Sequence, residues 1–282
     1  PHTPYRAPES FGNPFADEPL PAPWITEEVF SEHLMHVGPH SANEIAMWDD
    51  STSPQFPRHP GRLENMADMK DMIDQYDCGV RYTDDNIAQI LDLLKKKGLY
   101  GDDLAVIITS DHGENMGELG IYGEHATADE PTCHIPMIIK WPGAKKNFVA
   151  RGLHDNVDLL PTVQELLGTK IAGNYDYDGV SYAGTLLEGE DCARESVVLT
   201  QCCHVCQRSA RFGDYLYVRT IHGGYHLLPR EMLFNLKEDP HQQHNLAEEH
   251  PELCAQGARI VLDWTDAVSY THLRAHETEL HL

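Results

Sequence analysis

The stretch from Thr83 to Gly143 decides how this sequence folds, and it reads TDDNIAQILDLLKKKGLYGDDLAVIITSDHGENMGELGIYGEHATADEPTCHIPMIIKWPG. Apolar residues recur at helical spacing before Gly98, which can end a helix in the left-handed conformation. The run Leu104–Thr109 has the length and composition of a strand buried on both faces. A helix leading into such a strand predicts an α/β sheet.

Asp111 and His112 follow the expected strand directly. In open α/β sheets, ligands bind beyond the carboxyl ends of the strands, which is where this pair would fall. A carboxylate suits Ca²⁺ or Mg²⁺, whereas an added imidazole shifts the preference toward Zn²⁺ or Mn²⁺. The pair is therefore a candidate metal site. The alternative is structural, with Asp111 capping a turn and His112 packing beside it.

Composition narrows the classes of partner. The 282 residues include 45 acidic and 21 basic side chains, for a formal net charge of −24. This balance argues against nucleic acid and anionic membranes, whose binding needs clustered Lys and Arg. No apolar run approaches the length of a membrane span. Seven cysteines are too few and too irregularly spaced for a disulfide scaffold.

Periodicity and turn residues outline the other elements. Residues 1–62 are rich in Pro, His and acidic side chains, which predicts an irregular segment that wraps the core. Helices are expected over 63–97, with a break at Tyr82–Thr83, and over 158–167 before Gly168. The remaining expected elements are a core strand over 137–141, a turn-rich stretch over 173–179, a small antiparallel sheet from 197–201, 207–212 and 215–221, and a closing helix over 251–264.

Cys202, Cys203, His204 and Cys206 form a conspicuous cluster. Adjacent cysteines in a strand point to opposite faces, and zinc sites usually use separated cysteine pairs. The spacing therefore favours an ordinary strand over a metal site at these residues.

Several motifs together resemble one family. The strand followed by Ser110–Gly113, and then by HIPMIIKWPG, is similar to the sulfatase family of the alkaline-phosphatase superfamily. In the same order, Pro1–Tyr5 resembles the family's substrate-histidine segment, and Asp158–Thr162 resembles the helix after its core. Leu233–Leu236, with the Asp-Pro and Asn-Leu pairs that follow, resembles its C-terminal signature. The similarity covers residues 1–264.

The resemblance implies a fold and a division into domains. The fold would be α/β, part of a mixed-sheet, alkaline-phosphatase-like core with helices on both faces, plus a small C-terminal antiparallel sheet and a closing helix. Residues 1–190 would form the C-terminal part of the catalytic core, and 191–266 an α+β subdomain. Residues 267–282 resemble a translated sequencing-adapter read-through and are expected to be a non-native tail, with a natural polar tail as the alternative.

The resemblance also implies roles for particular side chains. Asp111, with His112, would hold Ca²⁺, or alternatively Mg²⁺ or Mn²⁺. His2 would protonate or steady the leaving oxygen. His125 stands where many sulfatases place a lysine that contacts the sulfate, and an imidazolium supplies that charge only below its pKa. The alternative for His125 is an ordinary loop histidine.

His222 and His226 flank two glycines, in a stretch that would rim the site and contact a sugar. A plain hairpin turn fits the same residues equally well.

Two features of the family have no counterpart in this sequence. The C/S-x-P/A-x-R motif, whose Cys or Ser becomes the catalytic formylglycine, is not found, and neither Asp49–Asp50 nor Asp84–Asp85 matches the paired N-terminal aspartates. The chain is therefore expected to be the C-terminal part of a longer sulfatase, with the formylglycine upstream. Alone, it should not turn over an aryl sulfate and should expose apolar sheet edges. The resemblance favours a periplasmic or secreted location for the whole protein.

The expected activity is metal-dependent hydrolysis of a sulfate ester, on a glycan or another sulfated small molecule. The runner-up is a phosphonate or phosphodiester hydrolase of the same superfamily, which carries a similar SDHG segment. A third alternative is an inactive, glycan-binding relative. An upstream C/S-x-P/A-x-R motif would separate the enzymes from the inactive relative.

Overall fold

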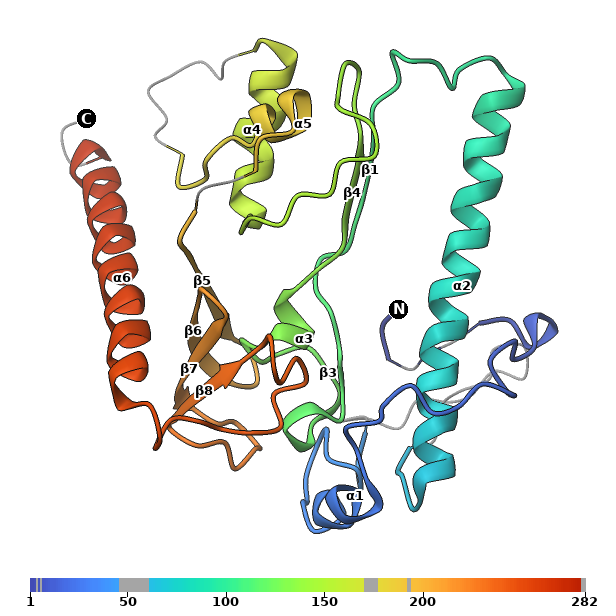
Figure 1. Ribbon diagram of the computed structural model, residues 1–282, viewed down its shortest axis with the longest axis vertical. Coiled ribbons are helices and arrows are strands. Elements are labelled where there is room, and N and C mark those ends of the chain that lie inside the picture. Colours follow the sequence, from blue (N-terminus) through green and yellow to red (C-terminus); the bar gives the residue numbers. More distant parts are fainter. Residues whose placement is uncertain (4, 6, 46–60, 170–176, 192–193, 280–282) are drawn as a thin grey trace.

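The computed structural model describes residues 1–3, 5, 7–45, 61–169, 177–191 and 194–279, with side chains up to residue 268. The helices are α1 (Glu27–His33), α2 (Met66–Lys96), α3 (Glu130–Cys133), α4 (Leu159–Leu167), α5 (Ala183–Glu188) and α6 (Pro251–Glu279), with short 3-10 helices η1 (Glu9–Phe11), η2 (Glu118–Gly120) and η3 (Asn156–Asp158). The strands are β1 (Val106–Thr109), β2 (Asn115–Met116), β3 (Tyr122–Glu124), β4 (Met137–Lys140), β5 (Ser196–Cys202), β6 (Cys206–Phe212), β7 (Tyr215–His222) and β8 (Glu231–Asn235). Figure 1 shows their arrangement, which confirms the expected mixed α/β class.

The long helix α2 begins where the side chain of Asn65 accepts hydrogen bonds from two backbone N–H groups of the first turn. It ends before Gly98, which adopts the left-handed conformation with a φ of 69°. The expected break at Tyr82–Thr83 is wrong. Thr83 does not cap a new start, because its hydroxyl donates to the carbonyl of Gly79, one turn earlier in a continuous helix.

Strands β1 and β4 form where the sequence indicates, and they pair antiparallel with Ile108 opposite Ile138. The expectation that β1 is buried on both faces is wrong. Thr109 is exposed, the other β1 residues are half-buried, and Ile138 in β4 is 63% exposed. An open cavity of about 1770 Å³ borders β4, so this ribbon lacks a close-packed cover among the described residues. Length and apolarity predict a strand but do not say what covers it.

The N-terminal segment is more regular than its composition indicates. Helix α1 begins after Thr26, whose hydroxyl accepts a hydrogen bond from Val29 N, and its seven residues are too few for a recognisable period. The first hydrophobic core joins α1, the start of α2 and β3, through side chains that include Phe30, Met69 and Tyr122. Asp49 and Asp50 lie outside the described residues.

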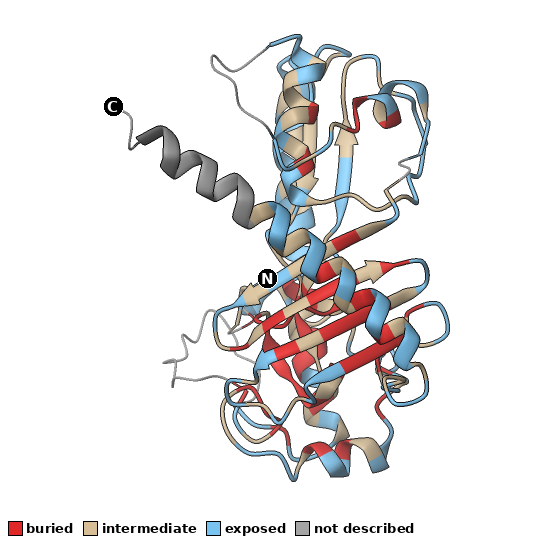
Figure 2. Ribbon diagram, turned by 90° about the vertical axis from the view of Figure 1, so that its left-hand side faces the viewer, coloured by how far each residue is buried: buried red, intermediate tan, exposed pale blue. Residues whose placement is uncertain are grey.

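The C-terminal sheet has the order β5–β6–β7–β8, with every neighbouring pair antiparallel. The three expected strands are confirmed, and β8 extends the sheet beyond them. Helix α6 lies across one face, as Figure 2 shows, and continues to Glu279, past the expected end at Trp264. The core on the opposite face includes Leu216 and Phe234, with Leu119 of η2 packed against them. The sheet therefore contacts the loops that follow β1.

The remaining expected elements are found in part. Helix α4 ends at Gly168, which has the left-handed φ of 61° that the sequence predicts. The turn-rich stretch at 173–179 falls largely outside the described residues, as do residues 280–282. The division at residue 190 and the non-native origin of 267–282 stay predictions. None of the helices in the described part of the chain is both long and apolar enough to cross a bilayer.

Buried His33 makes the stability of the N-terminal core depend on pH. Burial, with a smaller effect of nearby His36, lowers the pKa of His33 from 6.5 to about 4. Its Nδ1 lies 2.6 Å from the hydroxyl of Tyr122. The native state thus binds fewer protons than the unfolded state between these pH values, and stability falls as the pH falls through this window.

We expect the His33 contribution to decrease by about 3 kcal/mol at most between pH 6.5 and pH 4. The measurement is the free energy of unfolding in urea for the wild type and for His33→Gln, which cannot titrate here. The advantage of the wild type should shrink as the pH falls. A difference between the two proteins that stays constant with pH would contradict this expectation.

Candidate active site

The loop after β1 is fixed against α3 by a close backbone approach. The N–H of Gly113 donates to the carbonyl of Thr132 at 2.7 Å. A Cβ built on Gly113 would stand 1.9 Å from the carbonyl oxygen of Pro131, so a side chain does not fit here. The preceding residues, Asp111 and His112, are thereby held between the end of β1 and the start of α3.

A buried network of hydrogen bonds stabilises the loop that follows β1. Asn115 donates to the carboxylate of Asp129 at 2.9 Å and accepts from the hydroxyls of Thr127 and Thr132. Asp129 also caps α3 by accepting from Thr132 N. Burial raises the pKa of Asp129, while these hydrogen bonds lower it, and burial has the larger effect. Such a network is rigid as long as each member keeps its partners.

The C-terminal sheet holds the loop that carries His125. The side chain of Gln201 donates to the carbonyl of His125 at 3.2 Å, and Gln207 accepts from Ala128 N at 3.0 Å. The hydroxyl of Ser209 donates to the carbonyl of Ala128. Strands β5 and β6 therefore set the position of the 125–128 loop.

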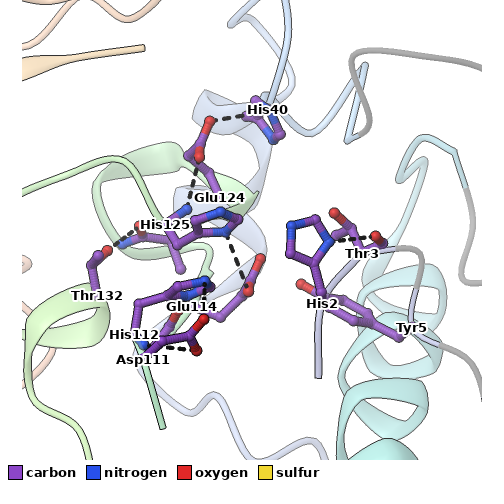
Figure 3. A network of polar contacts seen from close by, with 12 residues as sticks. His2, Thr3, Tyr5, His40, Asp111, His112, Glu114, Glu124, His125 and Thr132 are labelled. Atoms are coloured by element: carbon purple, nitrogen blue, oxygen red, sulfur yellow. Dashed lines mark hydrogen bonds and ion pairs between the residues drawn. The ribbon is translucent and has the colours of Figure 1, made fainter. Parts of the chain in front are cut away.

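Three histidines meet in the space that these supports define, as Figure 3 shows. The rings of His112 and His125 are stacked with centroids 3.9 Å apart, and the ring of His2 lies 5.0 Å from that of His125. Backbone carbonyls lie beside Nδ1 of His2, at 2.6 Å, and beside Nδ1 of His112, at 2.8 Å. If each Nδ1 donates its proton to the neighbouring carbonyl, the hydrogen bond fixes the ring and leaves Nε2 free to face a ligand.

Glu114 is the site residue that sequence analysis missed. Its side chain is 2% exposed, and Oε2 lies 3.7 Å from Nδ1 of His125. The other oxygen, Oε1, is buried without a hydrogen-bond partner among the described residues. Interaction with this carboxylate raises the pKa of His125 and outweighs burial, which lowers it. The protonated form of His125 is therefore favoured, as the expected role in sulfate binding requires.

Asp111 reaches into solvent at the edge of the site, with its side chain 89% exposed. Its carboxylate accepts from His112 N at 3.1 Å, and backbone hydrogen bonds, followed by the charge of His112, lower the pKa of Asp111. Ligand atoms of His112, Glu114 and His125 all lie within 4.8 Å of one another. Two carboxylates beside imidazoles, one oxygen being buried without a partner, suit a divalent cation. The assignment of Asp111 and His112 as ligands stays a prediction.

His222 is the last residue of β7, and His226 lies in the turn that follows this strand. His222 is exposed, and its Nδ1 accepts from Gly224 N at 3.1 Å. The turn that follows closes with a bond from His226 N to the carbonyl of Gly223. His226 is half-buried, and burial lowers its pKa while the nearby Glu124 raises it. A turn is therefore present at these residues. The predicted contact between the two histidines and a sugar stays a prediction.

Comparison with known proteins agrees with the motifs. Residues 22–169 match the model of the sulfatase family. The chain is 27% identical over 256 residues to the choline-sulfatase of Rhizobium meliloti, covering 88% of this chain and 44% of that protein. It is also 27% identical over 289 residues to the multifunctional alkaline phosphatase superfamily protein PehA of Trinickia caryophylli, covering 94% of this chain and 53% of that protein. The chain spans about half the length of these relatives.

A solved structure of a putative sulfatase from Bacteroides thetaiotaomicron has a similar fold. The TM-score is 0.59 with 25% sequence identity, and the match covers 75% of this chain and 46% of that chain. The family model matches more than half of the present sequence and includes the SDHG loop, His125 and α4. The chain therefore belongs to the sulfatase family of the alkaline-phosphatase superfamily.

Proposed function

We propose that the whole protein hydrolyses sulfate esters of sugars in a metal-assisted reaction, at the site that contains His2, Asp111, His112, Glu114 and His125. The observation that carries this proposal is the meeting of His2 with His112 and His125 beside a buried carboxylate. These residues come from the irregular segment that begins with Pro1 and from two separate loops. Their convergence supports a reaction centre rather than three unrelated surface histidines.

Asp111 and His112 would hold the divalent cation, Ca²⁺ being the first choice and Mg²⁺ or Mn²⁺ the alternatives. When bound, the cation would offset the negative charge on the sulfate oxygens. The protein's formal charge of −24 makes such local positive charge necessary for an anionic substrate. The formylglycine nucleophile is expected upstream of this chain.

His125 would bind the sulfate as an imidazolium, because Glu114 favours its charged form. The same carboxylate would orient the ring through Nδ1, at 3.7 Å, and turn Nε2 toward the substrate. His2 would act as the imidazolium, with one proton on Nδ1 directed at the carbonyl of Thr3, 2.6 Å away, and the other on Nε2. Donation of the Nε2 proton to the ester oxygen would help the alcohol to leave.

A sugar is favoured as the alcohol because an exposed aromatic side chain lies in the turn after β7, beside His204. Tyr225 is 53% exposed, and its ring centroid lies 6.4 Å from that of His204. Aromatic faces stack on the apolar faces of other rings while their polar tips stay hydrated. His222, exposed at the end of β7, would supply a polar contact for hydroxyl groups of the sugar.

The test is a substrate panel with a catalytically competent form of the protein. We would measure kcat/KM for sulfated monosaccharides, an aryl sulfate, choline sulfate, a phosphonate monoester and a phosphodiester. The highest value is expected for a sulfated sugar. A higher value for the phosphonate or the phosphodiester would contradict the proposal and favour a phosphonate or phosphodiester hydrolase. This alternative is tested because the similar protein PehA is named as multifunctional. No turnover at all would indicate an inactive relative.

The role of His125 gives a direct prediction. His125→Ala should lower kcat/KM for a sulfate ester by about 10²-fold, since removing one preorganised charge contact costs roughly 3 kcal/mol in the transition state. His125→Lys should retain most of the activity because the positive charge is kept. His250→Ala, at an exposed histidine that is also paired with a glutamate, is the matched control. If His125→Ala is as active as the wild type, the sulfate contact lies elsewhere.

A further inference from the structure

A second group of potential ligands, the Glu124 cluster, consists of His40, Glu124 and His204. Oε2 of Glu124 lies 3.1 Å from Nε2 of His40 and 2.9 Å from Nδ1 of His204. The side chains of His40 and Glu124 are 7% and 2% exposed, and that of His204 is 32% exposed. The ligand atoms of all three residues lie within 4.8 Å of one another. Figure 3 shows His40 directed at Glu124, beside the site histidines.

The hydrogen bonding of His40 indicates which of its nitrogens faces the carboxylate as an acceptor. Nδ1 lies 3.3 Å from the carbonyl of Tyr122, which can only accept a hydrogen bond. A proton on Nδ1 leaves a lone pair on Nε2, and this buried atom has no hydrogen-bond partner within the described part of the chain. A lone pair and a carboxylate oxygen at 3.1 Å repel each other unless a proton or a cation lies between them.

In metal sites, the ring nitrogen that does not bind the metal usually donates a hydrogen bond to a backbone carbonyl or a carboxylate. This hydrogen bond fixes the tautomer and orients the metal-binding nitrogen. The second oxygen of Glu124 is held in the same way, since it accepts from His125 N at 2.8 Å. Both ligands are therefore oriented by the backbone around them. This orientation by the backbone distinguishes the Glu124 cluster from a chance grouping of polar side chains.

We propose that His40, Glu124 and His204 form a zinc site that is separate from the reaction centre. Two imidazoles and one carboxylate suit Zn²⁺ better than Ca²⁺ or Mg²⁺, which prefer oxygen ligands. With metal–ligand bonds of about 2.0–2.1 Å, tetrahedral ligand atoms stand roughly 3.3 Å apart. The two observed separations, 3.1 and 2.9 Å, are a few tenths of an ångström shorter. Small side-chain rotations would admit the ion.

A third imidazole, that of His226, lies close to this group. Nε2 of His226 is buried and has no hydrogen-bond partner among the described residues, and the charges of Glu124, His40 and His204 all act on its pKa. The turn that carries it is pressed against the His204 backbone, since a Cβ on Gly224 would stand 2.0 Å from the His204 carbonyl oxygen. His226 is thus placed to complete the coordination, directly or through water.

The three proposed ligands come from segments far apart in the sequence. His40 follows α1, Glu124 ends β3, and His204 lies in the turn between β5 and β6. An ion bound to all three would join the N-terminal core to the C-terminal sheet, directly beside His125. Because the unfolded chain cannot hold this arrangement, binding of Zn²⁺ would stabilise the native state.

Thiols offer a competing explanation for any zinc uptake by this chain. Sγ atoms of Cys202 and Cys206 lie 3.4 Å apart at the end of the β5–β6 hairpin, two residues on either side of His204. Thiolates bind Zn²⁺ strongly, so stoichiometry alone does not identify the ligands. The test must therefore separate imidazole and carboxylate ligands from sulfur.

The experiment is a Zn²⁺ titration by calorimetry of the wild type, His204→Gln and His40→Gln. His204→Gln is the main variant because its partly exposed side chain can be replaced without loss of the fold, which circular dichroism would check. Two controls are matched to it: His250→Gln, an exposed histidine whose Nδ1 lies 3.3 Å from Glu252, and the double variant Cys202→Ser/Cys206→Ser. Each protein is also titrated with Co²⁺ and followed by visible and near-ultraviolet absorption.

We expect His204→Gln and His40→Gln to bind one Zn²⁺ fewer than the wild type, or to bind it at least ~10²-fold more weakly. Both controls and Asp111→Ala should keep this site, and Zn²⁺ should raise the Tm of the wild type but not of His204→Gln. The cobalt spectrum should lack thiolate charge-transfer bands. Unchanged zinc affinity in His204→Gln, loss of the site in the cysteine variant, or no zinc binding by the wild type would each overturn the proposal.

Discussion

Replacing Asp111 with alanine is expected to lower kcat/KM for a sulfate ester by at least about 10²-fold in a catalytically competent form of the protein. The carboxylate is one of the proposed ligands of the divalent cation, and charge stabilisation by such an ion is worth several kcal/mol in the transition state. The side chain is 89% exposed, so its removal leaves no cavity. Activity should therefore fall without loss of stability.

The measurement combines steady-state kinetics, metal content and Tm for Asp111→Ala and for a matched control. Asp263→Ala removes another exposed carboxylate, on α6, where it pairs with Arg259 one turn earlier. The control should keep both its activity and its metal. An Asp111→Ala protein with normal metal content and rate would show that the cation, if there is one, is held by other residues.

Replacing Gly113 with alanine is expected to cost about 3 kcal/mol of stability, at the upper end of what an overpacked site loses. The new Cβ would stand 1.9 Å from the Pro131 carbonyl oxygen, a backbone atom that cannot rotate away. The loop must therefore separate from α3 and break the bond from Gly113 N to Thr132. Because His112 directly precedes Gly113, activity should fall together with stability.

A control for Gly113→Ala is provided by Gly184 in the short helix α5. A Cβ there meets no atom within 4 Å, and alanine suits a helix better than glycine does. Gly184→Ala should therefore leave stability unchanged or raise it slightly. The measurement is the free energy of unfolding in urea for both variants. Equal stability of the two would show that the loop can shift without cost.

Much of the local structure could be predicted from the sequence because it depends on neighbours along the chain. Gly98 and Gly168 end helices as expected, and the strands at 106–109 and 137–140 form where apolar runs indicate. The burial of β1 could not be predicted, because it depends on which segments cover the strand. The break expected at Thr83 failed for a related reason, since the hydroxyl had an alternative partner within a continuing helix.

Some residues of the candidate site could likewise be predicted from the sequence, and others could not. Asp111, His112 and His125 stand in recognisable motifs, so sequence alone predicted that they act together, and the structure does bring His112 and His125 into contact. Glu114 carries no such signal, because an acidic residue two positions after His112 is unremarkable until its carboxylate is found buried. The Glu124 cluster is harder still to foresee. Its members become neighbours only when three distant segments fold together.

The bonds that hold the 125–128 loop have a consequence for the order in which the protein folds. They link residues 76, 79 and 81 positions apart along the chain, so the loop cannot take its final shape from local interactions. Closing such long segments is slow and entropically costly. Helix α2 and the β5–β8 hairpins contain contacts of much shorter range. His125 would thus be among the last residues to reach its native position, and its arrival would report that the 125–128 loop has joined strands β5 and β6.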